Sequence, residues 1–251
     1  MNQTGHHVNT QARLGYLVGQ LPILHPGITS YEEVKDELAR EERRRVEKSH
    51  ESTSPYVLRV KIALLEKGIE FQYKEERDVF EDKNKSELLL ESNPIYKKVP
   101  VLILNGKPIC ESLIILEYID EVWKQEQQLF SADPYYRAKA RFWIDFFDKK
   151  TTTCGKKLWA NKGEDQDAAK REFVECLKLL ENELGEKPYF GGDHFALLDI
   201  AWIPITCRFY TYDKLCKFSV EEECPKFMEW VRRCNMRESV SKTLPDPFKV
   251  F

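Results

Sequence analysis

The sequence lacks a hydrophobic run that could cross a membrane, and it lacks an excess of positive charge. A membrane-spanning helix needs about 18 or more consecutive apolar residues, and no run in this chain approaches that length. The 39 lysines and arginines are balanced by 42 aspartates and glutamates, which leaves a net charge of -3. A chain with this balance has no general attraction for a polyanion. We therefore expect no membrane and no nucleic acid among its partners.

Paired cysteines are also missing. The seven cysteines contain no Cys-x-x-Cys pair, and their odd number does not fit a complete set of disulfides. Structural zinc sites and small secreted domains depend on such pairs. The sequence therefore predicts no metal site, and it favours a reducing compartment, the cytosol (cytoplasmic), as the location of the protein.

Acidic residues are absent from residues 1–31 and dense in residues 32–50. The first segment is faintly like an organelle-targeting peptide, but it has too few arginines and serines, so targeting is the less favoured alternative. The second segment mixes acids and bases with few aliphatic residues, which is typical of a solvated helix; a partner-binding surface is the alternative. We expect residues 1–50 to be an N-terminal extension, poorly ordered or partly helical.

Regular patterns begin at Ser54. Ser54-Pro55 combines a preferred N-cap residue with a proline at the first helical position, and the apolar face that follows ends at Gly68. The next patterns predict a strand at 69–73, a short helix before Pro94, a hairpin of two strands over 99–110 with an Asn105-Gly106 turn, and a helix over 111–122. This order is that of a thioredoxin-like α/β domain over residues 51–122 that lacks its opening strand.

The second half contains no strand candidate. After a linker at residues 123–133, the chain shows helical patterns, which we expect at 135–160, 165–185, 197–213, 221–234 and 237–243. The sequence therefore predicts an all-α domain over residues 134–251. A hydrophobic fraction of 42% in 251 residues is ordinary for a globular protein, so both domains can bury a core.

Five segments stand out by their order and spacing, and they read SPYVLRVKIALLEKGIEFQYKEE, NKSELLLESNP, YKKVPVLILNGKPICESLIILEYIDEVW, DPYYRAKARFW and YFGGDHFALLDIAW. Together they resemble the tau-class glutathione transferases of plants, from Ser54 to Phe251. The resemblance implies the glutathione-transferase fold, with a thioredoxin-like domain before an all-helical one. It also implies an enzyme that joins the glutathione thiolate to small hydrophobic electrophiles in detoxification, a homodimer, and no cofactor beyond glutathione as co-substrate.

Ser54 is explained most simply as a helix cap, but the same position suits catalysis. A hydroxyl at a helix N-terminus lies among free N–H groups, at the positive end of the helix dipole, where a thiolate is stabilised. Lowering a thiol pKa from about 8.5 by ~2 units takes about 2.7 kcal/mol. One hydrogen bond to a charged sulfur (about 1.5–3 kcal/mol) and the helix end (about 0.3–1 kcal/mol) can supply this. The resemblance implies that Ser54 is the catalytic residue.

The resemblance also implies how glutathione is held at its cysteinyl and glutamyl ends. The peptide bond before Pro100 is implied to be cis, so that the backbone of Val99 faces the cysteinyl part; a purely structural proline at a strand start is the alternative. Glu111 is implied to meet the γ-glutamyl ammonium and Ser112 the carboxylate. Without the resemblance, a Glu-Ser pair in a first helical turn is merely favourable to the helix dipole.

Three basic residues receive different expectations. By themselves Lys85 and Lys98 are ordinary surface lysines, but their positions in the NKS and KKVP motifs match the family's lysines that face the glycine carboxylate of glutathione. Arg59 matches no assigned role, and we expect it at an exposed position of its helix.

The helical half is expected to supply the acceptor pocket and one structural carboxylate. By family position the pocket uses Thr152, Lys156 and Trp159, where Thr152 and Lys156 replace a more usual tyrosine and arginine. Asp199 lies three residues after Ala196 at the start of a helix, a position that fits a buried carboxylate holding backbone N–H groups. We expect Asp199 to have a structural role rather than to act as a general base.

The first strand is where the chain departs most from the family. Residues 47–53 contain no apolar residue, whereas the family has an apolar central strand directly before the catalytic serine. Either an upstream segment such as Leu14–Val18 or Leu21–Leu24 takes its place, or the sheet is incomplete. Because glycine and prolines interrupt these segments, we expect only a partial substitute, and thus a first strand that is degenerate or missing.

Two other functions remain open from the sequence. A catalytically weak or inactive ligand-binding protein of the same fold is the main alternative, since a missing central strand would harm the site. A glutathione-dependent thiol oxidoreductase is the third, but it would need a cysteine in place of Ser54.

Overall fold

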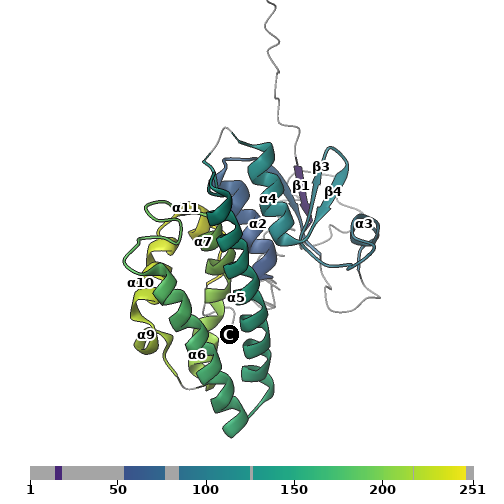
Figure 1. Ribbon diagram of the computed structural model, residues 1–251. Coiled ribbons are helices and arrows are strands. Elements are labelled where there is room, and N and C mark those ends of the chain that lie inside the picture. Colours follow the sequence, from purple (N-terminus) through teal and green to yellow (C-terminus); the bar gives the residue numbers. More distant parts are fainter. Residues whose placement is uncertain (1–14, 19–53, 77–84, 125–126, 217, 247–251) are drawn as a thin grey trace, which may run out of the picture.

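The computed structural model describes residues 15–18, 54–76, 85–124, 127–216 and 218–246. In these ranges the chain forms a four-stranded sheet with helices packed against it, followed by a larger group of helices (Figure 1). The predicted combination of an α/β part and an all-helical part is confirmed.

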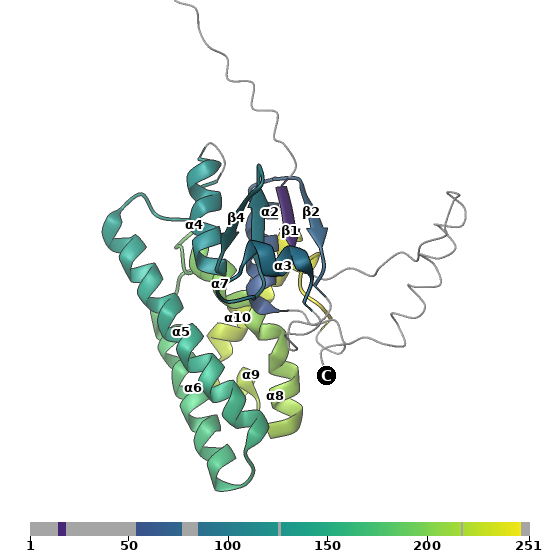
Figure 2. The same ribbon diagram turned by 90° about the vertical axis from the view of Figure 1, so that its right-hand side faces the viewer.

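The α/β part contains four strands and three helices within the described residues. The strands are β1 (Gly15–Val18), β2 (Phe71–Lys74), β3 (Val101–Leu104) and β4 (Lys107–Cys110), and the helices are α2 (Pro55–Glu66), α3 (Glu87–Ser92) and α4 (Ser112–Val122). Helices α2 and α4 lie on one face of the sheet, toward the helical part, and α3 lies on the other face (Figures 1 and 2). From α2 to α4 the order of elements is the predicted one.

Strand β2 begins later than predicted because of the way α2 ends. Gly68 has a φ of 63°, a left-handed conformation that glycine adopts at little cost. The Ile69 N–H donates to the Leu64 carbonyl at 2.9 Å and so closes the last turn of the helix. Ile69 therefore belongs to the helix terminus, and the strand starts at Phe71.

The opening strand is present, and it comes from the segment that we expected to be an extension. The strand order is β2-β1-β3-β4, with β1 parallel to β2 and antiparallel to β3. Residues 16–18 pair with neighbours on both sides, so β1 is a central strand. The strand, Gly15–Val18, comes from the first of the two upstream segments that were considered, and Leu14 itself lies outside the described residues. Leu21–Leu24 and residues 47–53 lie outside the described residues.

The second part of the described chain is all helical. Its helices are α5 (Pro134–Ala160), α6 (Glu164–Leu184), α7 (Leu197–Trp202), the 3-10 helix η2 (Ile203–Arg208), α8 (Phe209–Cys216), α9 (Val220–Glu223), α10 (Pro225–Asn235) and α11 (Glu238–Ser241). Helices α5 and α6 form a long pair that extends away from the sheet (Figure 2).

Two helices that we expected to be continuous are divided at prolines. The stretch 197–213 changes from α7 to η2 and then to α8 around Pro204, which has no N–H to donate to the α-helical ladder. The stretch 221–234 is interrupted at Cys224, which has a φ of -140° because a residue before a proline is disfavoured in the helical region. The prediction of single helices was wrong at both places.

The two parts share one hydrophobic core. Val60 and Ile62 of α2 belong to the same buried cluster as Phe147 of α5 and Trp202 of α7. Helix α2 is buried on nearly all sides, as expected for a helix with apolar residues around its circumference. It therefore holds the sheet and the helical part together.

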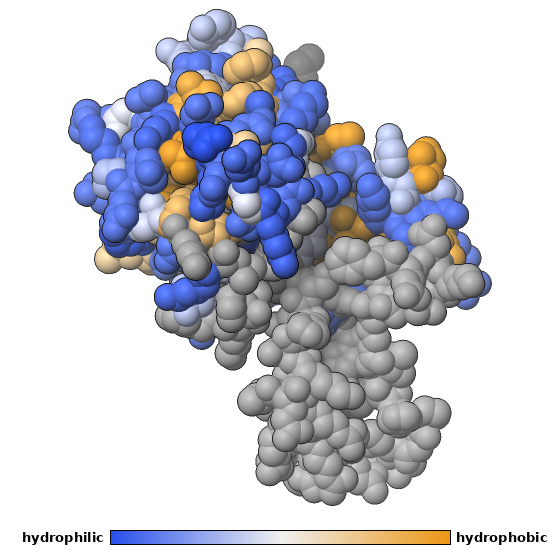
Figure 3. Space-filling view, turned by 90° about the horizontal axis from the view of Figure 1, so that it is seen from below, coloured by the Kyte–Doolittle hydropathy of each residue, from blue (hydrophilic) through white to orange (hydrophobic). Residues whose placement is uncertain are grey.

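One face of the described surface is mainly polar (Figure 3). Seen from below, it is hydrophilic with small, separate hydrophobic patches (Figure 3). No helix in the described ranges is both long enough and apolar enough to traverse a bilayer.

The central place of β1 can be tested with a proline. Leu17→Pro removes one N–H from a strand that is paired on both sides, so we expect the α/β part to lose about 3 kcal/mol or more of stability. Leu17→Val keeps the N–H and is the control. Urea unfolding measures the loss, and amide hydrogen exchange should show it in β2 and β3. Equal stability of the two variants would mean that β1 is not part of the sheet.

Candidate functional site

The strand register brings most of the predicted site residues to one end of the sheet. Strands β1, β2 and β4 end there and β3 begins there, since Val18 pairs with Lys74 and Val101, and Val101 pairs with Cys110. The segments that leave this end of the sheet are therefore neighbours, and they are Val99-Pro100 before β3, Glu111-Ser112 after β4, and the residues from Glu75 onward after β2.

Helix α2 begins at the same end. Because β1 and β2 are parallel, the helix between them runs in the opposite direction and starts where β1 ends. Ser54 is its half-buried N-cap residue, and its carbonyl accepts hydrogen bonds from Val57 N–H at 2.9 Å and Leu58 N–H at 3.1 Å. Its side chain makes no capping hydrogen bond to the described helix. The hydroxyl is thus placed at a helix N-terminus without being used by that helix.

The segment before β3 has the expected cis peptide bond between Val99 and Pro100. Pro100 is buried, and Val99 is half-buried between the two hydrophobic clusters. Buried Asn93 holds the preceding turn, since its side-chain N–H donates to the Lys98 carbonyl at 2.9 Å and its side-chain oxygen accepts from Tyr96 N–H at 3.2 Å. The backbone at Val99 is therefore fixed from both sides.

Glu111 and Ser112 form the turn from β4 into α4. Glu111 is exposed and has a φ of 68°, a left-handed conformation that is uncommon for a residue other than glycine. Its carbonyl accepts the Ile115 N–H at 2.9 Å, so it is the N-cap of α4. Ser112, the next residue, is buried. A residue held in such a conformation is often found at a functional site.

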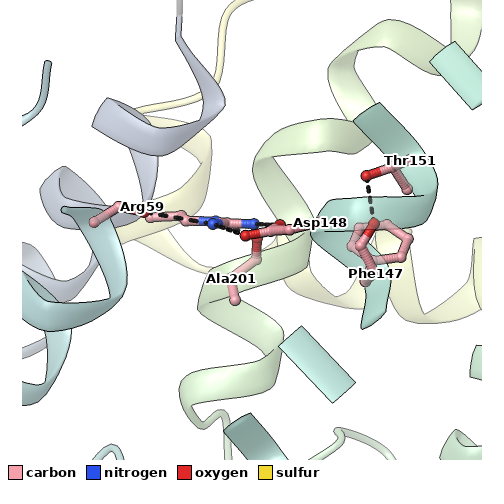
Figure 4. A network of polar contacts seen from close by, with 6 residues as sticks. Arg59, Phe147, Asp148, Thr151 and Ala201 are labelled. Carbon is pink, nitrogen blue, oxygen red and sulfur yellow. Dashed lines mark hydrogen bonds and ion pairs between the residues drawn. The ribbon is translucent and has the colours of Figure 1, made fainter. Parts of the chain in front are cut away.

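Arg59 is fully buried, and our expectation of an exposed position was wrong. Its Nε donates to the Ala201 carbonyl at 2.6 Å, and its Nη1 donates to Asp148 Oδ2 at 2.9 Å, while Nη2 donates to the other oxygen of Asp148 (Figure 4). The Nη1 group also donates to the Ser112 hydroxyl at 3.5 Å. A buried guanidinium is tolerated because the bidentate carboxylate compensates its charge. This network joins α2, α4, α5 and α7 beside the predicted site.

One feature of the sequence indicates that Arg59 is buried. The residue lies between Leu58 and Val60 in a helix that is apolar around most of its circumference, and a helix of that kind is buried as a whole. Its partner Asp148 is 89 positions away, so the pairing itself could not be read from the sequence.

The two predicted lysines differ in exposure. Lys98 is exposed, and Lys85 is half-buried. Lys85 directly precedes Ser86, the N-cap of α3, whose backbone N–H and hydroxyl both donate to the carboxylate of Glu76. Both lysines lie on segments that lead to or from the same end of the sheet.

The predicted acceptor residues follow Asp148 along α5. Thr152, Lys156 and Trp159 are spaced by four and three residues, which places them on one face of a helix. Lys156 is exposed, whereas the side chains of Thr152 and Trp159 lie outside what the structure describes. Asp148 is one turn before Thr152, so its bond to Arg59 fixes this face of α5 next to α2.

Asp199 is completely buried at the start of α7. Its carboxylate accepts hydrogen bonds from Phe190 N–H at 3.0 Å, Ala196 N–H at 2.9 Å and Trp230 Nε1–H at 2.7 Å. Burial raises the pKa of Asp199 to about 6, although these bonds and one from Gly191 N–H oppose the rise. All these donors belong to the protein framework, which supports the structural role.

The cysteines offer no competing nucleophile. All seven are free, and six of them are buried. Cys110, directly before Glu111, is half-buried, but burial and the charge of Glu111 raise the pKa of its thiol. Its Sγ–H donates to the Ser92 carbonyl at 3.4 Å. Cys110 is therefore a protonated thiol.

The described residues form no metal site, and a cavity that they line lies away from this end of the sheet. No group of three or more His, Cys, Asp or Glu side chains in the described ranges could hold a metal ion. A cavity of about 680 Å³ lies at the opposite end of α2, where Leu65, Glu66 and Arg237 line it. Its lining contains none of the predicted site residues.

Two family models match the chain. One is described as the N-terminal domain of glutathione S-transferase and matches residues 53–122, and the other is described as the C-terminal domain and matches residues 163–233. A relative named probable glutathione S-transferase parC from Nicotiana tabacum is 56% identical over 198 residues, which cover 78% of this chain and 88% of the relative. Glutathione S-transferase U19 from Arabidopsis thaliana is 54% identical over 197 residues, with coverage of 78% and 88%.

Solved structures are similar as well. The crystal structure of rice GST1 (OsGSTU1) in complex with glutathione superposes with a TM-score of 0.77 at 39% identity, covering 94% of this chain and 92% of that one. A tau-class glutathione S-transferase from mango, Mangifera indica, gives a TM-score of 0.76 at 32% identity and covers 94% of each chain.

The contribution of the buried ion pair can be measured by unfolding. Arg59→Met leaves the partly exposed Asp148 and the buried Ala201 carbonyl without their donor, so we expect a loss of about 1–3 kcal/mol. The double variant Arg59→Met with Asp148→Leu should be less destabilised than the single one. Lys149→Met breaks an exposed pair with Asp145 on the same helix and should change stability little. A loss of stability no larger than that of this control would contradict the proposed contribution of the Arg59–Asp148 pair to stability.

Asp199 predicts a specific pH dependence. Its pKa is about 6 in the folded protein and about 3.9 in an unfolded chain, so the folded state binds the proton more tightly. The stability from this group is therefore complete below about pH 4 and is lost as the pH rises through about 6. Asp199→Asn cannot titrate, and its amide turns a donor toward one of the N–H groups, which should cost about 1–3 kcal/mol.

Urea unfolding of the parent and Asp199→Asn between about pH 4 and pH 7 tests this sign. The stability difference between the two should shrink as the pH rises. A difference that stays constant or grows would show that the carboxylate is ionised throughout.

Proposed function

The chain belongs to the glutathione S-transferase family, and from this premise we propose that it is a tau-type transferase that adds the glutathione thiolate to small hydrophobic electrophiles. The observation that carries the proposal is the position of the Ser54 hydroxyl. It lies at the N-terminus of α2 without capping that helix, at the sheet end where Val99 and the Glu111-Ser112 turn meet.

The chemistry asks little more of the protein than a stabilised thiolate and correct placement. The Ser54 hydroxyl donates to the glutathione sulfur and favours its ionised form, and the positive end of α2 adds to this. The thiol proton leaves to solvent, and the thiolate then attacks the electrophilic atom of the acceptor. It either displaces a leaving group or adds to the acceptor, which then takes up a proton from solvent. Holding both partners side by side converts a bimolecular encounter into one within a complex. Glutathione is a co-substrate, and the proposed reaction uses no further cofactor.

Glutathione is held at this end of the sheet. The backbone of Val99 pairs with the cysteinyl part, Glu111 with the γ-glutamyl ammonium, and the Ser112 hydroxyl with the α-carboxylate of that residue. The glycine carboxylate faces Lys85 and Lys98. Each charged end of the tripeptide thus meets a group of opposite charge or a hydrogen-bond donor, which fixes the sulfur near Ser54.

The acceptor binds against α5. Thr152, Lys156 and Trp159 line this side, with an aromatic ring for apolar electrophiles and one cation at Lys156. Because lysine and threonine replace the more usual arginine and tyrosine, the range of acceptors should differ from that of typical members. A conjugation activity of this kind serves detoxification, and seven free cysteines fit a reducing compartment such as the cytosol.

The alternatives have less support. An inactive ligand-binding protein was suggested by the missing central strand, and β1 now fills that position. A thiol oxidoreductase needs a reactive cysteine near the thiol of glutathione, whereas Cys110, the one cysteine that is not fully buried, has a raised pKa.

A homodimer forms through α4 and α5 in our proposal. Large apolar side chains are exposed on these two helices, namely Ile114, Val122, Tyr135, Tyr136 and Phe142. The helices lie side by side, since Arg141 of α5 makes an ion pair with Glu117 of α4 at 2.7 Å. An exposed apolar patch with a polar border is typical of a protein-protein interface.

The catalytic role of Ser54 is tested by removing its hydroxyl. Ser54→Ala should bind glutathione within a few-fold of the parent but lower kcat/KM by about 10- to 100-fold, equivalent to roughly 1.5–3 kcal/mol of lost thiolate stabilisation. Ultraviolet difference titration should show that the pKa of the bound thiol rises. Ser131→Ala, at an exposed position of the linker, is the matched control. Unchanged activity and thiol pKa would remove Ser54 from the catalytic role.

The dimer is tested by placing a charge in the exposed patch. Phe142→Glu should yield monomers in sedimentation-velocity experiments, because an unpaired carboxylate would be buried in the interface. Leu179→Glu introduces the same charge at an exposed apolar position of α6 and should leave the dimer intact. If the parent itself sediments as a monomer, the proposed homodimer is wrong.

A further inference from the structure

We propose that Glu76 is a positioning residue for the recognition of the glycine carboxylate, acting through Ser86 on Lys85. The inference rests on the proposed function, in which Lys85 faces that carboxylate. Glu76 follows β2 near the functional end of the sheet, and it was not among the residues that the sequence singled out.

The carboxylate of Glu76 is buried, with only 3% of the residue exposed. Its Oε1 accepts the Ser86 N–H at 2.5 Å, and its Oε2 accepts the Ser86 hydroxyl at 2.6 Å. A buried carboxylate is costly unless it is well satisfied. Here both oxygens are directed at one residue, ten positions further along the chain, so the carboxylate fixes both the backbone and the side chain of Ser86.

Ser86 in turn fixes the start of α3. Its hydroxyl oxygen accepts the Leu89 N–H at 3.1 Å and caps the helix. Leu89 is fully buried and packs with Val101, the first residue of β3. Helix α3 has only six residues, too short to be stable by itself. The short helix thus depends on Glu76 at its start and on Leu89 in its first turn.

Lys85 is joined directly to the fixed residue. Consecutive Cα atoms are about 3.8 Å apart, so holding the backbone of Ser86 determines where the Lys85 side chain begins. A lysine side chain is long and loses much rotational freedom when it binds a ligand. Fixing its base limits the positions that its ammonium group can reach and favours contact with a carboxylate at a defined distance.

A structural role alone and a positioning role make different predictions. If Glu76 only stabilises the fold, its loss should weaken the binding of every thiol substrate equally. If it acts through Lys85, the loss should be confined to substrates that carry the glycine carboxylate. γ-Glutamylcysteine has the glutamyl and cysteinyl groups of glutathione and lacks the glycine, so it separates the two roles.

The experiment is steady-state kinetics with one aryl halide as electrophile and either glutathione or γ-glutamylcysteine as the thiol. Glu76→Ala and Lys85→Ala should each raise the KM for glutathione by about 10-fold and leave the KM for γ-glutamylcysteine within about 2-fold, with kcat little changed. The double variant should have about the same KM for glutathione as the single variants, since both changes remove the same contact. Glu70→Ala, an exposed carboxylate before β2, is the control and should behave like the parent.

Glu76→Gln keeps the test valid if the alanine variant does not fold. Its carbonyl can still accept one of the two Ser86 donors, so the rise in the glutathione KM should be smaller, about 3-fold, and again absent with γ-glutamylcysteine. Equal losses with both thiols, or no loss with glutathione, would overturn the positioning role.

The outcomes also separate this inference from the proposed function. If the parent conjugates glutathione and Lys85→Ala alone loses the preference for it, the function stands and the role of Glu76 is refuted. A parent that uses both thiols equally well lacks the glycine contact, which refutes this inference while conjugation remains. A parent that conjugates neither thiol refutes the proposed function and this inference with it.

Discussion

The buried guanidinium of Arg59 is the contact on which the arrangement of the two domains depends. A charge in the centre of a protein is stable only where a partner of opposite charge and enough hydrogen-bond acceptors surround it. Arg59 finds these on three other helices, at Asp148 of α5, the Ala201 carbonyl of α7 and the Ser112 hydroxyl of α4. Apolar packing tolerates small shifts, whereas this set of donors and acceptors fits in one relative position. The contact therefore fixes where the proposed acceptor face of α5 lies relative to the proposed glutathione side.

The far end of α2 is fixed by the same kind of contact. Glu66 accepts hydrogen bonds from Arg237, the N-cap of α11, and from Ser239 in that helix. Lys67 makes an ion pair with Asp120 at 2.7 Å. Between these polar ends the helix is apolar and packs into the shared core. The helix is thus fixed along its whole length, and this fixes the position of its N-terminus, where Ser54 lies. Such support is what a site needs if a hydroxyl is to meet a sulfur atom within hydrogen-bond distance.

Local signals allowed much of the fold to be predicted. Ser54-Pro55 marks the start of α2, Gly68 its end, and Asn105-Gly106 the hairpin, because each depends on the conformational preferences of one or two residues. Asp199 was recognisable for a similar reason, since it accepts the N–H of the helix N-cap Ala196, three positions earlier. Its bonds from Phe190 N–H and Trp230 Nε1–H required the structure. The prolines that divide the predicted helices are also visible in the sequence. The prediction followed the helical periodicity of the apolar residues and did not take these prolines into account.

Long-range contacts are what the sequence could not supply. The burial of Arg59 depends on a carboxylate 89 positions away, and that of Glu76 depends on a serine ten positions further along the chain. Strand β1 is separated from α2 by residues 19–54, so the usual strand-helix spacing gave no guide to it. In each case the residue type can be read from the sequence, but the contact that decides its role forms only when the chain folds. The candidate site was therefore predicted by resemblance, and its supporting contacts required the structure.

The central claim is that glutathione binds at the sheet end where α2 and α4 begin, with its ammonium group at Glu111. Isothermal titration of glutathione into the parent and into Glu111→Gln tests it directly, because the amide keeps the size of the side chain and removes only its charge. We expect the parent to bind glutathione and the variant to bind at least about tenfold more weakly, a loss of about 1.4 kcal/mol. Equal affinities, or no binding by the parent, would contradict the account.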